Sequence, residues 1–297
     1  MIKSIKGYLG YFTIAINTII ITILVAPFAL LKKYSSHSEV KKYCLICLHK
    51  LGKIWITVNY WTIKLLNPIK WDISGMEQLQ NLPQDKWYLL ISNHQSWNDV
   101  FILQFLFKNY LPFQKYFIKE EMRNFPLMGF IWEAIDCPFL KRVDKEKIKN
   151  NPELSGMDLL EIREKSKKFK LVPSTIVSFV EGTRYSAEKH SRQQSPFKHL
   201  LKPKAGGIAC TLAELNREIK AIIDVSLVFS VRDSNLWDLY TGKLNKVSVK
   251  INYIEIPSWL ADKYKNNINY EEYKEQFQTW LNQIWLEKDE YINSHLT

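Results

Sequence analysis

An uncharged apolar run near the N-terminus constrains this chain more than any other feature. No Asp, Glu, Lys or Arg occurs between Lys6 and Lys32, and the 25 residues of Gly7–Leu31 read GYLGYFTIAINTIIITILVAPFALL. A helix rises about 1.5 Å per residue, so this run is long enough to cross a hydrocarbon core of about 30 Å. The sequence therefore predicts a membrane anchor, while Asn17 and Pro27 leave open whether it spans the bilayer or enters one leaflet.

A cleaved signal peptide is the alternative interpretation of this run. Its apolar region would be about 7–15 residues long and would precede a small-residue cleavage site. Here the run continues into APFALLKKY, which is typical of a segment that is retained.

The lysines around the run predict its orientation. Six lysines follow it and two precede it: Lys32, Lys33, Lys41, Lys42, Lys50 and Lys53 against Lys3 and Lys6. The more basic flank of an anchor stays in the cytoplasm. We therefore expect a bacterial inner (cytoplasmic) membrane protein whose main domain lies on the cytoplasmic side.

A second apolar and aromatic stretch, Cys44–Leu66, predicts another helix. It would lie in the membrane interface, with Trp55, Tyr60 and Trp61 at headgroup level; a buried helix of the soluble domain is the alternative. We accordingly divide the chain into a membrane-associated helical segment, residues 1–70, and a main domain, residues 71–297.

Charge and cysteine content bound the partners. The formal net charge of +11 suits nucleic acid, an anionic membrane surface or phosphorylated substrates. No basic-aromatic nucleic-acid motif is evident, so we expect no nucleic-acid partner. The Cys-x-x-Cys of Cys44 and Cys47 lies in an apolar helical stretch, and we expect no metal site.

The main domain alternates predicted strands with predicted helices. This order favours an α/β fold with a mainly parallel sheet flanked by helices, joined to the N-terminal membrane-anchoring segment. The strands that carry this prediction are Lys86–Ser92, Ser174–Val180, Ile222–Phe229 and Val247–Tyr253. Functional sites in such sheets gather where strands end at their carboxyl edge.

The loop NHQSWND follows the first of these strands and contains His94 and Asp99. A turn would bring the Asp99 carboxylate to one ring nitrogen of His94 and leave the other nitrogen free as a base. The alternative is a helix cap made by Ser96 and Asp99. Since the chain has no G-x-S-x-G motif, this pair suggests that a substrate hydroxyl supplies the nucleophile.

The stretch FVEGTRYS places an acid and a guanidinium at the end of the strand Ser174–Val180. Glu181 and Arg184 either form an internal salt bridge or face an anionic ligand.

Together, the two stretches resemble blocks of the glycerolipid acyltransferases, the family that includes the 1-acylglycerol-3-phosphate acyltransferases (PlsC-like). NHQSWND resembles the NHx4D block and FVEGTRYS the FPEGTRS block, with Val180 in place of the usual proline. The stretch FIKEEMRNFPLMGFIWEAIDCPFLKR between them is similar to a further block. HLLKPKAGGIACTL, at His199–Leu212, resembles the YihG-like and lysocardiolipin acyltransferase branch in particular.

The resemblance implies acyl transfer from an acyl-CoA or acyl-ACP thioester to the hydroxyl of a lysophospholipid. His94 would deprotonate the hydroxyl and Asp99 would orient His94. Glu181, Gly182, Thr183 and Arg184 would hold the acceptor phosphate. Lys119 and Arg142 are further candidates for that phosphate, with solvated surface charge as the alternative for both. The acyl carrier is a co-substrate, and no other cofactor is implied.

For the acceptor, we expect 1-acyl-sn-glycerol-3-phosphate, which would give phosphatidic acid in phospholipid biosynthesis. Another lysophospholipid and glycerol-3-phosphate are alternatives within the family. A non-enzymatic, membrane-tethered protein that binds anionic lipid is the alternative outside it.

Overall fold

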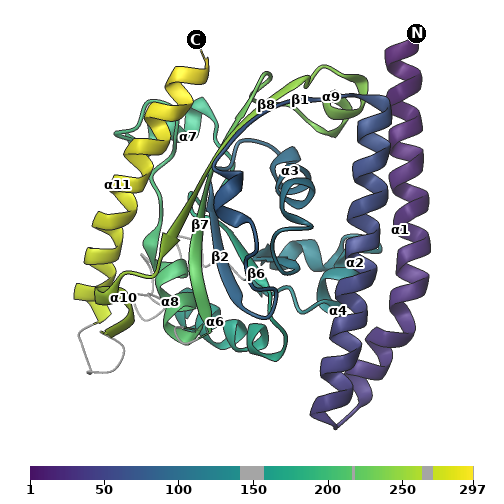
Figure 1. Ribbon diagram of the computed structural model, residues 1–297, viewed down its shortest axis with the longest axis horizontal. Helices are drawn as coiled ribbons and strands as arrows, with labels where there is room; N and C mark the ends of the chain where they lie inside the picture. The colour runs from purple at the N-terminus through teal and green to yellow at the C-terminus, as the bar shows by residue number, and fades with distance from the viewer. Residues whose placement is uncertain (141–156, 216–217, 263–269, 297) are drawn as a thin grey trace.

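The computed structural model describes residues 1–140, 157–215, 218–262 and 270–296 of the chain. Two long N-terminal helices form a hairpin along one side of an α/β sheet domain (Figure 1). They are α1 (Ile2–Tyr34) and α2 (Ser38–Leu66).

Helix α1 is apolar on its inner and its outer face. Ile21 and Val25 are buried, whereas Phe12 and Ile23 are about two-thirds exposed. Among the described residues, α1 is the one helix long and apolar enough to cross a membrane, with a mean hydropathy of 2.5 in its most apolar window. Within the described residues this outward apolar face is left exposed, which agrees with the predicted insertion into lipid.

Polar side chains fasten the two helices together. The amide of Asn17 donates to Asn59 Oδ1 at 2.9 Å, and Trp55 Nε1 donates to Thr18 Oγ1 at 3.0 Å. These bonds explain an asparagine inside an otherwise apolar run, because a buried amide needs a partner.

One face of α2 is buried in the core, as the alternative interpretation of the second apolar stretch expects, and its position at a membrane interface stays a prediction. Leu45 and Ile56 are buried in the core, whereas Trp61 and Ile54 are half exposed.

The main sheet has the strand order β1-β8-β7-β2-β6-β3. Its strands are β1 (Lys70–Ser74), β2 (Trp87–Ser92), β3 (Gln114–Tyr116), β6 (Thr175–Phe179), β7 (Ile219–Phe229) and β8 (Lys246–Glu255). All neighbours are parallel except β7 and β8. The predicted α/β fold with a mainly parallel sheet is thereby confirmed. A separate two-stranded sheet pairs β4 (Ile118–Lys119) with β5 (Phe139–Leu140).

Helices cover both faces of the main sheet (Figure 1). The hairpin, α3 (Asn98–Phe107) and α4 (Met128–Ala134) lie on one side, and α6 (Met157–Ser166), α8 (Ala205–Leu215) and α11 (Tyr270–Leu296) lie on the other. Shorter α-helices are α7 (Ala187–Gln193), α9 (Leu236–Thr241) and α10 (Ser258–Asp262), and 3-10 helices span Met76–Leu79, Glu120–Asn124 and Lys167–Leu171.

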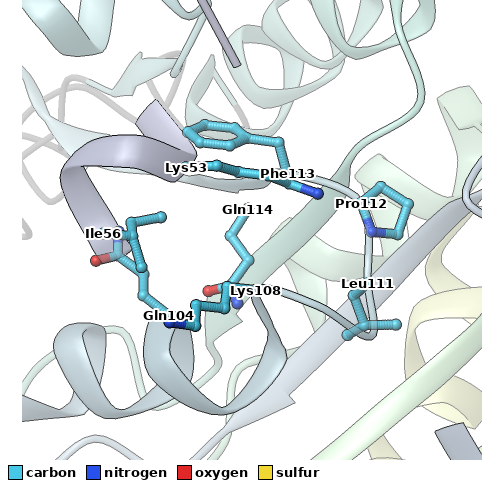
Figure 2. A pocket seen from close by; sticks show the side chains of 8 residues that line it. All are labelled: Lys53, Ile56, Gln104, Lys108, Leu111, Pro112, Phe113 and Gln114. Atoms are coloured by element: carbon cyan, nitrogen blue, oxygen red, sulfur yellow. The ribbon is translucent and has the colours of Figure 1, made fainter. Parts of the chain in front are cut away.

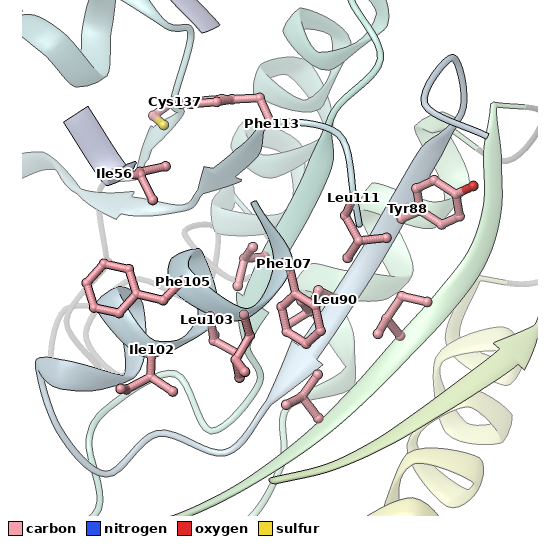
Figure 3. Packing of buried hydrophobic residues seen from close by; sticks show 14 of the residues in the cluster. Ile56, Tyr88, Leu90, Ile102, Leu103, Phe105, Phe107, Leu111, Phe113 and Cys137 are labelled. Atoms are coloured by element: carbon pink, nitrogen blue, oxygen red, sulfur yellow. The ribbon is translucent and has the colours of Figure 1, made fainter. Parts of the chain in front are cut away.

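Strand β2 separates the two hydrophobic cores because its side chains alternate between the faces of the sheet. Tyr88 and Leu90 belong to the same core as Phe107 of α3 (Figure 3), whereas Leu89 and Ile91 belong to the core under α8 and α11. The first core also contains α1 and α2 residues. The boundary predicted at residue 70 stays a prediction, since packing is continuous across it.

Candidate active site

The two loops singled out in the sequence leave the same edge of the sheet. Strands β2 and β6 are parallel neighbours, and Ser92 pairs with Phe179 at their carboxyl ends. Two backbone N–H groups then join the loops: His94 N donates to the side-chain oxygen Glu181 Oε1 at 3.0 Å, and Tyr185 N donates to the carbonyl oxygen of His94 at 2.8 Å. The parallel register therefore brings residues about 90 positions apart in sequence into one site.

His94 and Asp99 are in direct contact. Asp99 lies in the first turn of α3 with its side chain fully buried, and its Oδ2 lies 2.7 Å from His94 Nδ1. The His94 side chain is 17% exposed, and its Nε2 has no hydrogen-bond partner within the described part of the chain. This arrangement suits a base whose Nδ1 proton is held by a carboxylate.

The N-cap residue of α3 is Trp97, with no side-chain cap hydrogen bond, but Asp99 does bind the backbone that precedes the helix. The same Oδ2 accepts the backbone N–H groups of Gln95 at 2.7 Å and Ser96 at 2.9 Å. The Asp99 carboxylate thus orients the imidazole and fixes the backbone that carries it.

One face of the His94 ring is covered by Phe179. The rings are stacked with centroids 4.0 Å apart and an angle of 14° between their planes. This contact restricts ring rotation and gives the site an apolar wall.

Buried asparagine side chains hold the His94 loop against the neighbouring strand and the segment that follows it. Their role was not predicted from the sequence. Asn93 exchanges two hydrogen bonds with the Leu227 backbone, at 2.9 and 2.8 Å. The Asn98 amide donates to Ser234 Oγ and Asn235 O. Their only signal in sequence is a cluster of amides beside an apolar strand, which is also typical of an exposed turn.

Glu181 is placed differently from the prediction. Its side chain is fully buried, and its two oxygens accept the backbone N–H groups of His94 at 3.0 Å and Leu201 at 3.1 Å. Burial raises the pKa of Glu181 to about 8, against the opposing effect of these two N–H bonds. Both oxygens are engaged inside the protein, so Glu181 positions the loops instead of facing an acceptor phosphate.

The rest of the turn is open to solvent. Gly182 has φ +71°, a left-handed conformation that glycine adopts without strain. Thr183 Oγ1 accepts a hydrogen bond from Lys189 Nζ at 3.0 Å. The Arg184 guanidinium is exposed and lies 4.8 Å from the ring centroid of Trp97, which is itself half exposed. Among the described residues Arg184 forms no salt bridge, and in particular none with Glu181.

Two further cations carry no motif signal: Arg232 lies at this edge of the sheet, whereas Lys115 pairs with Ile176 near the start of β6, away from the His94 loop. Arg232 follows β7 at the same edge of the sheet, and its guanidinium lies 3.6 Å from the ring centroid of Tyr185. Lys115 in β3 is fully buried, its ammonium has no hydrogen-bond partner among the described residues, and burial lowers its pKa to about 8. A lysine within a short predicted strand looks like an ordinary surface residue in sequence.

The two weaker phosphate candidates stay predictions. Lys119 is exposed in β4, which belongs to the small separate sheet. Arg142 lies outside the described residues. In the described part of the chain, no group of three or more His, Cys, Asp or Glu side chains is arranged to hold a metal ion.

The fold and site define an α/β protein with an apolar helical hairpin, a His–Asp pair and an exposed guanidinium beside it. Residues 74–215, a little under half of the chain, match the family model described as Acyltransferase, so this segment is similar to that family. The matched segment contains His94, Asp99 and the Glu181–Arg184 turn.

Similar proteins agree with this assignment. The 1-acyl-sn-glycerol-3-phosphate acyltransferase delta of Bos taurus is 25% identical over 189 residues, covering 60% of this chain and 44% of that protein. The 2-acyl-1-lysophosphatidylinositol acyltransferase of Saccharomyces cerevisiae is 23% identical over 234 residues, covering 67% of this chain and 59% of that protein. The chain thus spans about half the length of the curated relatives it matches.

A solved structure extends the likeness to the whole fold. The crystal structure of the 1-acyl-sn-glycerophosphate (LPA) acyltransferase PlsC from Thermotoga maritima matches with a TM-score of 0.51 at 17% identity, over 98% of both chains. At this identity the match shows a shared fold. The predicted resemblance to the acyltransferases is confirmed, and the assignment to the YihG-like branch stays a prediction.

Proposed function

We propose that this protein transfers a fatty acyl group from a thioester donor to the free hydroxyl of a lysophospholipid. The observation that carries the proposal is the 2.7 Å contact between His94 Nδ1 and the buried Asp99 Oδ2, which leaves Nε2 unpaired. The names of the relatives, which act on lysophospholipids, support the substrate class.

The site residues suit a single displacement at the thioester carbonyl. His94 Nε2 accepts the hydroxyl proton while the substrate oxygen forms a bond to the carbonyl carbon. The carbon–sulfur bond then breaks, and the departing thiolate takes the proton from the imidazolium. The Asp99 carboxylate stabilises that imidazolium, so no acyl-enzyme and no protein nucleophile is needed.

Arg184 is the group best placed to hold the acceptor phosphate. A guanidinium offers parallel N–H groups that match phosphate oxygens, and Arg184 has no carboxylate partner in the described structure. Since this contact needs a phosphate, 1-acyl-sn-glycerol-3-phosphate is the simplest acceptor, with phosphatidic acid as product. The yeast relative's name keeps an acceptor with a larger headgroup as the second candidate.

The exposed apolar face of α1 supports membrane attachment, and the lysines after this helix favour a catalytic domain on the cytoplasmic side. We expect the full-length chain to sediment with membranes and to need detergent for extraction. A chain that is freely soluble and monomeric without amphiphile would contradict the anchor.

The proposed activity is tested with purified protein, oleoyl-CoA and lysophosphatidate, following thiol release with and without the acceptor. Acceptor-dependent release that disappears in His94→Ala supports the enzyme. Binding of anionic lipid without thiol release would instead support a non-enzymatic tethered protein. Repeating the assay with acyl-ACP, glycerol-3-phosphate and lysophosphatidylinositol then identifies the donor and the acceptor.

A further inference from the structure

The C-terminal helix α11 carries a lysine in the middle of its buried face. Its buried hydrophobic side chains recur at helical spacing and pack in the core on that side of the sheet: Phe277, Leu281, Trp285 and Ile292. Lys288 occupies the position between the last two of them and is only 1% exposed. A charged group at a core position is costly unless its donors are satisfied, so the contacts of this lysine indicate its role.

The ammonium group of Lys288 is bound to three oxygens of β7. Its Nζ donates to Val225 O at 2.7 Å and to Ser226 Oγ at 3.1 Å, and it forms a salt bridge with Asp224 Oδ1 at 2.8 Å. An ammonium group has three N–H donors, so these oxygens satisfy it. Strand β7 is thereby held at Val225, which pairs with the last residue of β2, two positions before His94.

The same part of β7 supports the His94 loop. The Leu227 backbone exchanges two hydrogen bonds with Asn93 and accepts a third from Gln95 Nε2 at 3.1 Å. The carbonyl oxygen that Lys288 binds lies two residues before Leu227 on the same strand. Lys288 therefore holds the strand to which the residues on both sides of His94 are bound.

The next residue of α11, Asp289, holds a second support of the loop. Its two carboxylate oxygens accept the backbone N–H groups of Lys198–His199, each at 2.7 Å. Two residues further along, Leu201 N donates to Glu181, whose other oxygen accepts the backbone N–H of His94. The segment between these contacts is thus held at one end by α11 and at the other by the active-site turn.

A cavity on the hairpin side of the sheet offers a contrast. Ile56 of α2, Gln104 of α3 and Phe113 are among the residues that line it (Figure 2), and its volume of about 10 Å³ holds about one water molecule. The buried Oε1 of Gln104 has no hydrogen-bond partner within the described structure. The cavity lies toward the start of β6, because Gln114, which also lines it, pairs with Thr175. Imperfect packing is therefore found away from the site, whereas the two charged residues of α11 bind where the site is supported.

We infer that Lys288 and Asp289 of the C-terminal helix are positioning residues for the proposed base His94. Lys288 holds β7, Asp289 holds the segment Lys198–Leu201, and the His94 loop is bound to both. Helix α11 lies outside residues 74–215, the segment that matches the family model. The inference rests on the proposed function, because His94 needs this positioning only if it acts as a base.

The first test follows the loop itself and does not require turnover. Hydrogen–deuterium exchange of the full-length protein in detergent, read by mass spectrometry, compares wild type with Asp289→Ala and with the exposed control Glu290→Ala. We expect Asp289→Ala alone to speed exchange severalfold in the peptides that contain Leu201 and His94, while β8 and α2 keep their exchange rates. No change at His94, or an equal rise across the whole sheet, overturns the inference.

The second test separates positioning from substrate binding by acceptor-dependent thiol release. Asp289→Ala should lower kcat roughly 10-fold and leave the KM of both substrates within about twofold of wild type, because a misplaced base slows the chemical step. Asp289→Asn keeps one accepting oxygen and should lose less, and Glu290→Ala should lose nothing. A raised KM with unchanged kcat overturns the inference. If wild type releases no thiol, the proposed function fails instead, and the exchange result still decides whether Asp289 holds the loop.

The third test separates the position of Lys288 from its charge. Lys288→Met leaves Asp224 buried without its partner, so lost stability alone would lower its activity. Lys288→Met/Asp224→Asn removes both charges, and we expect its Tm to recover. Its kcat, measured well below the lowest Tm of these variants, should stay roughly 10-fold under that of wild type, since Val225 O has lost its donor. A kcat equal to that of wild type in the double variant shows that the pair serves stability alone and overturns the role of Lys288.

Discussion

The loop after β2 and the turn after β6 meet at one site but are built in opposite ways. The His94 loop is buried and tied to Asp99, to β7 and to the segment before α9. In the turn, Arg184 is exposed, and its guanidinium lies over the Trp97 ring. A base must be held in one geometry, whereas a charge partner for a diffusing lipid must remain accessible.

Glu181 shows that a residue's place in a motif does not decide whether its side chain is buried and positions the loops or is exposed and can contact a substrate. It belongs to the turn by motif, but its carboxyl oxygens bind the backbone of His94 and Leu201. The comparison therefore separates positioning residues, which are buried, from contact residues, which are accessible. Substitutions at four residues test this separation.

The largest effect is expected for His94→Ala. It removes the base while leaving Asp99 with two backbone N–H partners, so the loop should keep its shape. We expect kcat to fall by roughly 10³-fold or more. The measurement is acceptor-dependent thiol release, with circular dichroism and vesicle binding as controls. Wild-type turnover in a folded His94→Ala protein would refute the mechanism.

Asp99→Asn should lower kcat less, by roughly 10²-fold, because the base is still present but poorly oriented. It should also destabilise the protein more than His94→Ala, by about 1–3 kcal/mol, since Oδ2 serves three N–H donors at once. Denaturant unfolding of both variants checks whether the one that loses less activity, Asp99→Asn, is the one that loses more stability. If His94→Ala is the less stable of the two, Asp99 does not hold the loop.

Arg184→Ala should raise the KM for the lysophospholipid by about 30-fold and leave the donor KM nearly unchanged. Arg184→Lys keeps the charge without the paired N–H groups, so we expect an intermediate loss. Monoacylglycerol, which has no phosphate, is the control acceptor and should be used equally poorly by all three proteins. A rise in donor KM instead would assign Arg184 to the thioester carrier.

Much of this site could be predicted because its determinants are local. The alternation of apolar strands and helices fixed the parallel sheet, and both loops follow strands that read clearly in sequence. Parallel neighbours necessarily bring their carboxyl ends to one edge, so the meeting of His94 with the turn follows from topology.

Burial of individual polar groups could not be predicted in the same way. The motif EGTR does not indicate that the Glu181 side chain is buried while that of Arg184 is exposed. Burial of Glu181 depends on the backbone N–H of Leu201, which is distant in sequence and donates to its carboxyl group. Lys115 and Arg232 are likewise placed by contacts distant in sequence. Loop residues are positioned by tertiary hydrogen bonds, and a local sequence pattern does not predict these bonds.

The smallest effect concerns the pH dependence of stability, and it tests the inward placement of Glu181. Burial raises the pKa of this carboxyl from its ordinary 4.5 to about 8. The folded protein therefore binds the proton more tightly than the unfolded chain. The stabilisation is complete below about pH 4.5 and is lost as the pH rises through about 8. Glu181→Gln stays neutral, so its Tm should lack this decline.

The measurement compares Tm in detergent between about pH 5 and pH 9, where the Glu181 carboxyl changes charge. We expect the wild-type value to fall toward that of Glu181→Gln by a few degrees as the pH rises. The control is Glu214→Gln. Although burial raises the pKa of Glu214, the hydrogen bonds and charges of Lys170 and Arg163 outweigh it and lower that pKa. The contribution of Glu214 to stability is therefore constant at every pH above the ordinary pKa of a glutamate. The Tm of Glu214→Gln should follow the wild-type Tm in parallel across this pH range. If the Glu181→Gln curve is parallel as well, Glu181 is charged throughout, and its burial does not set its protonation.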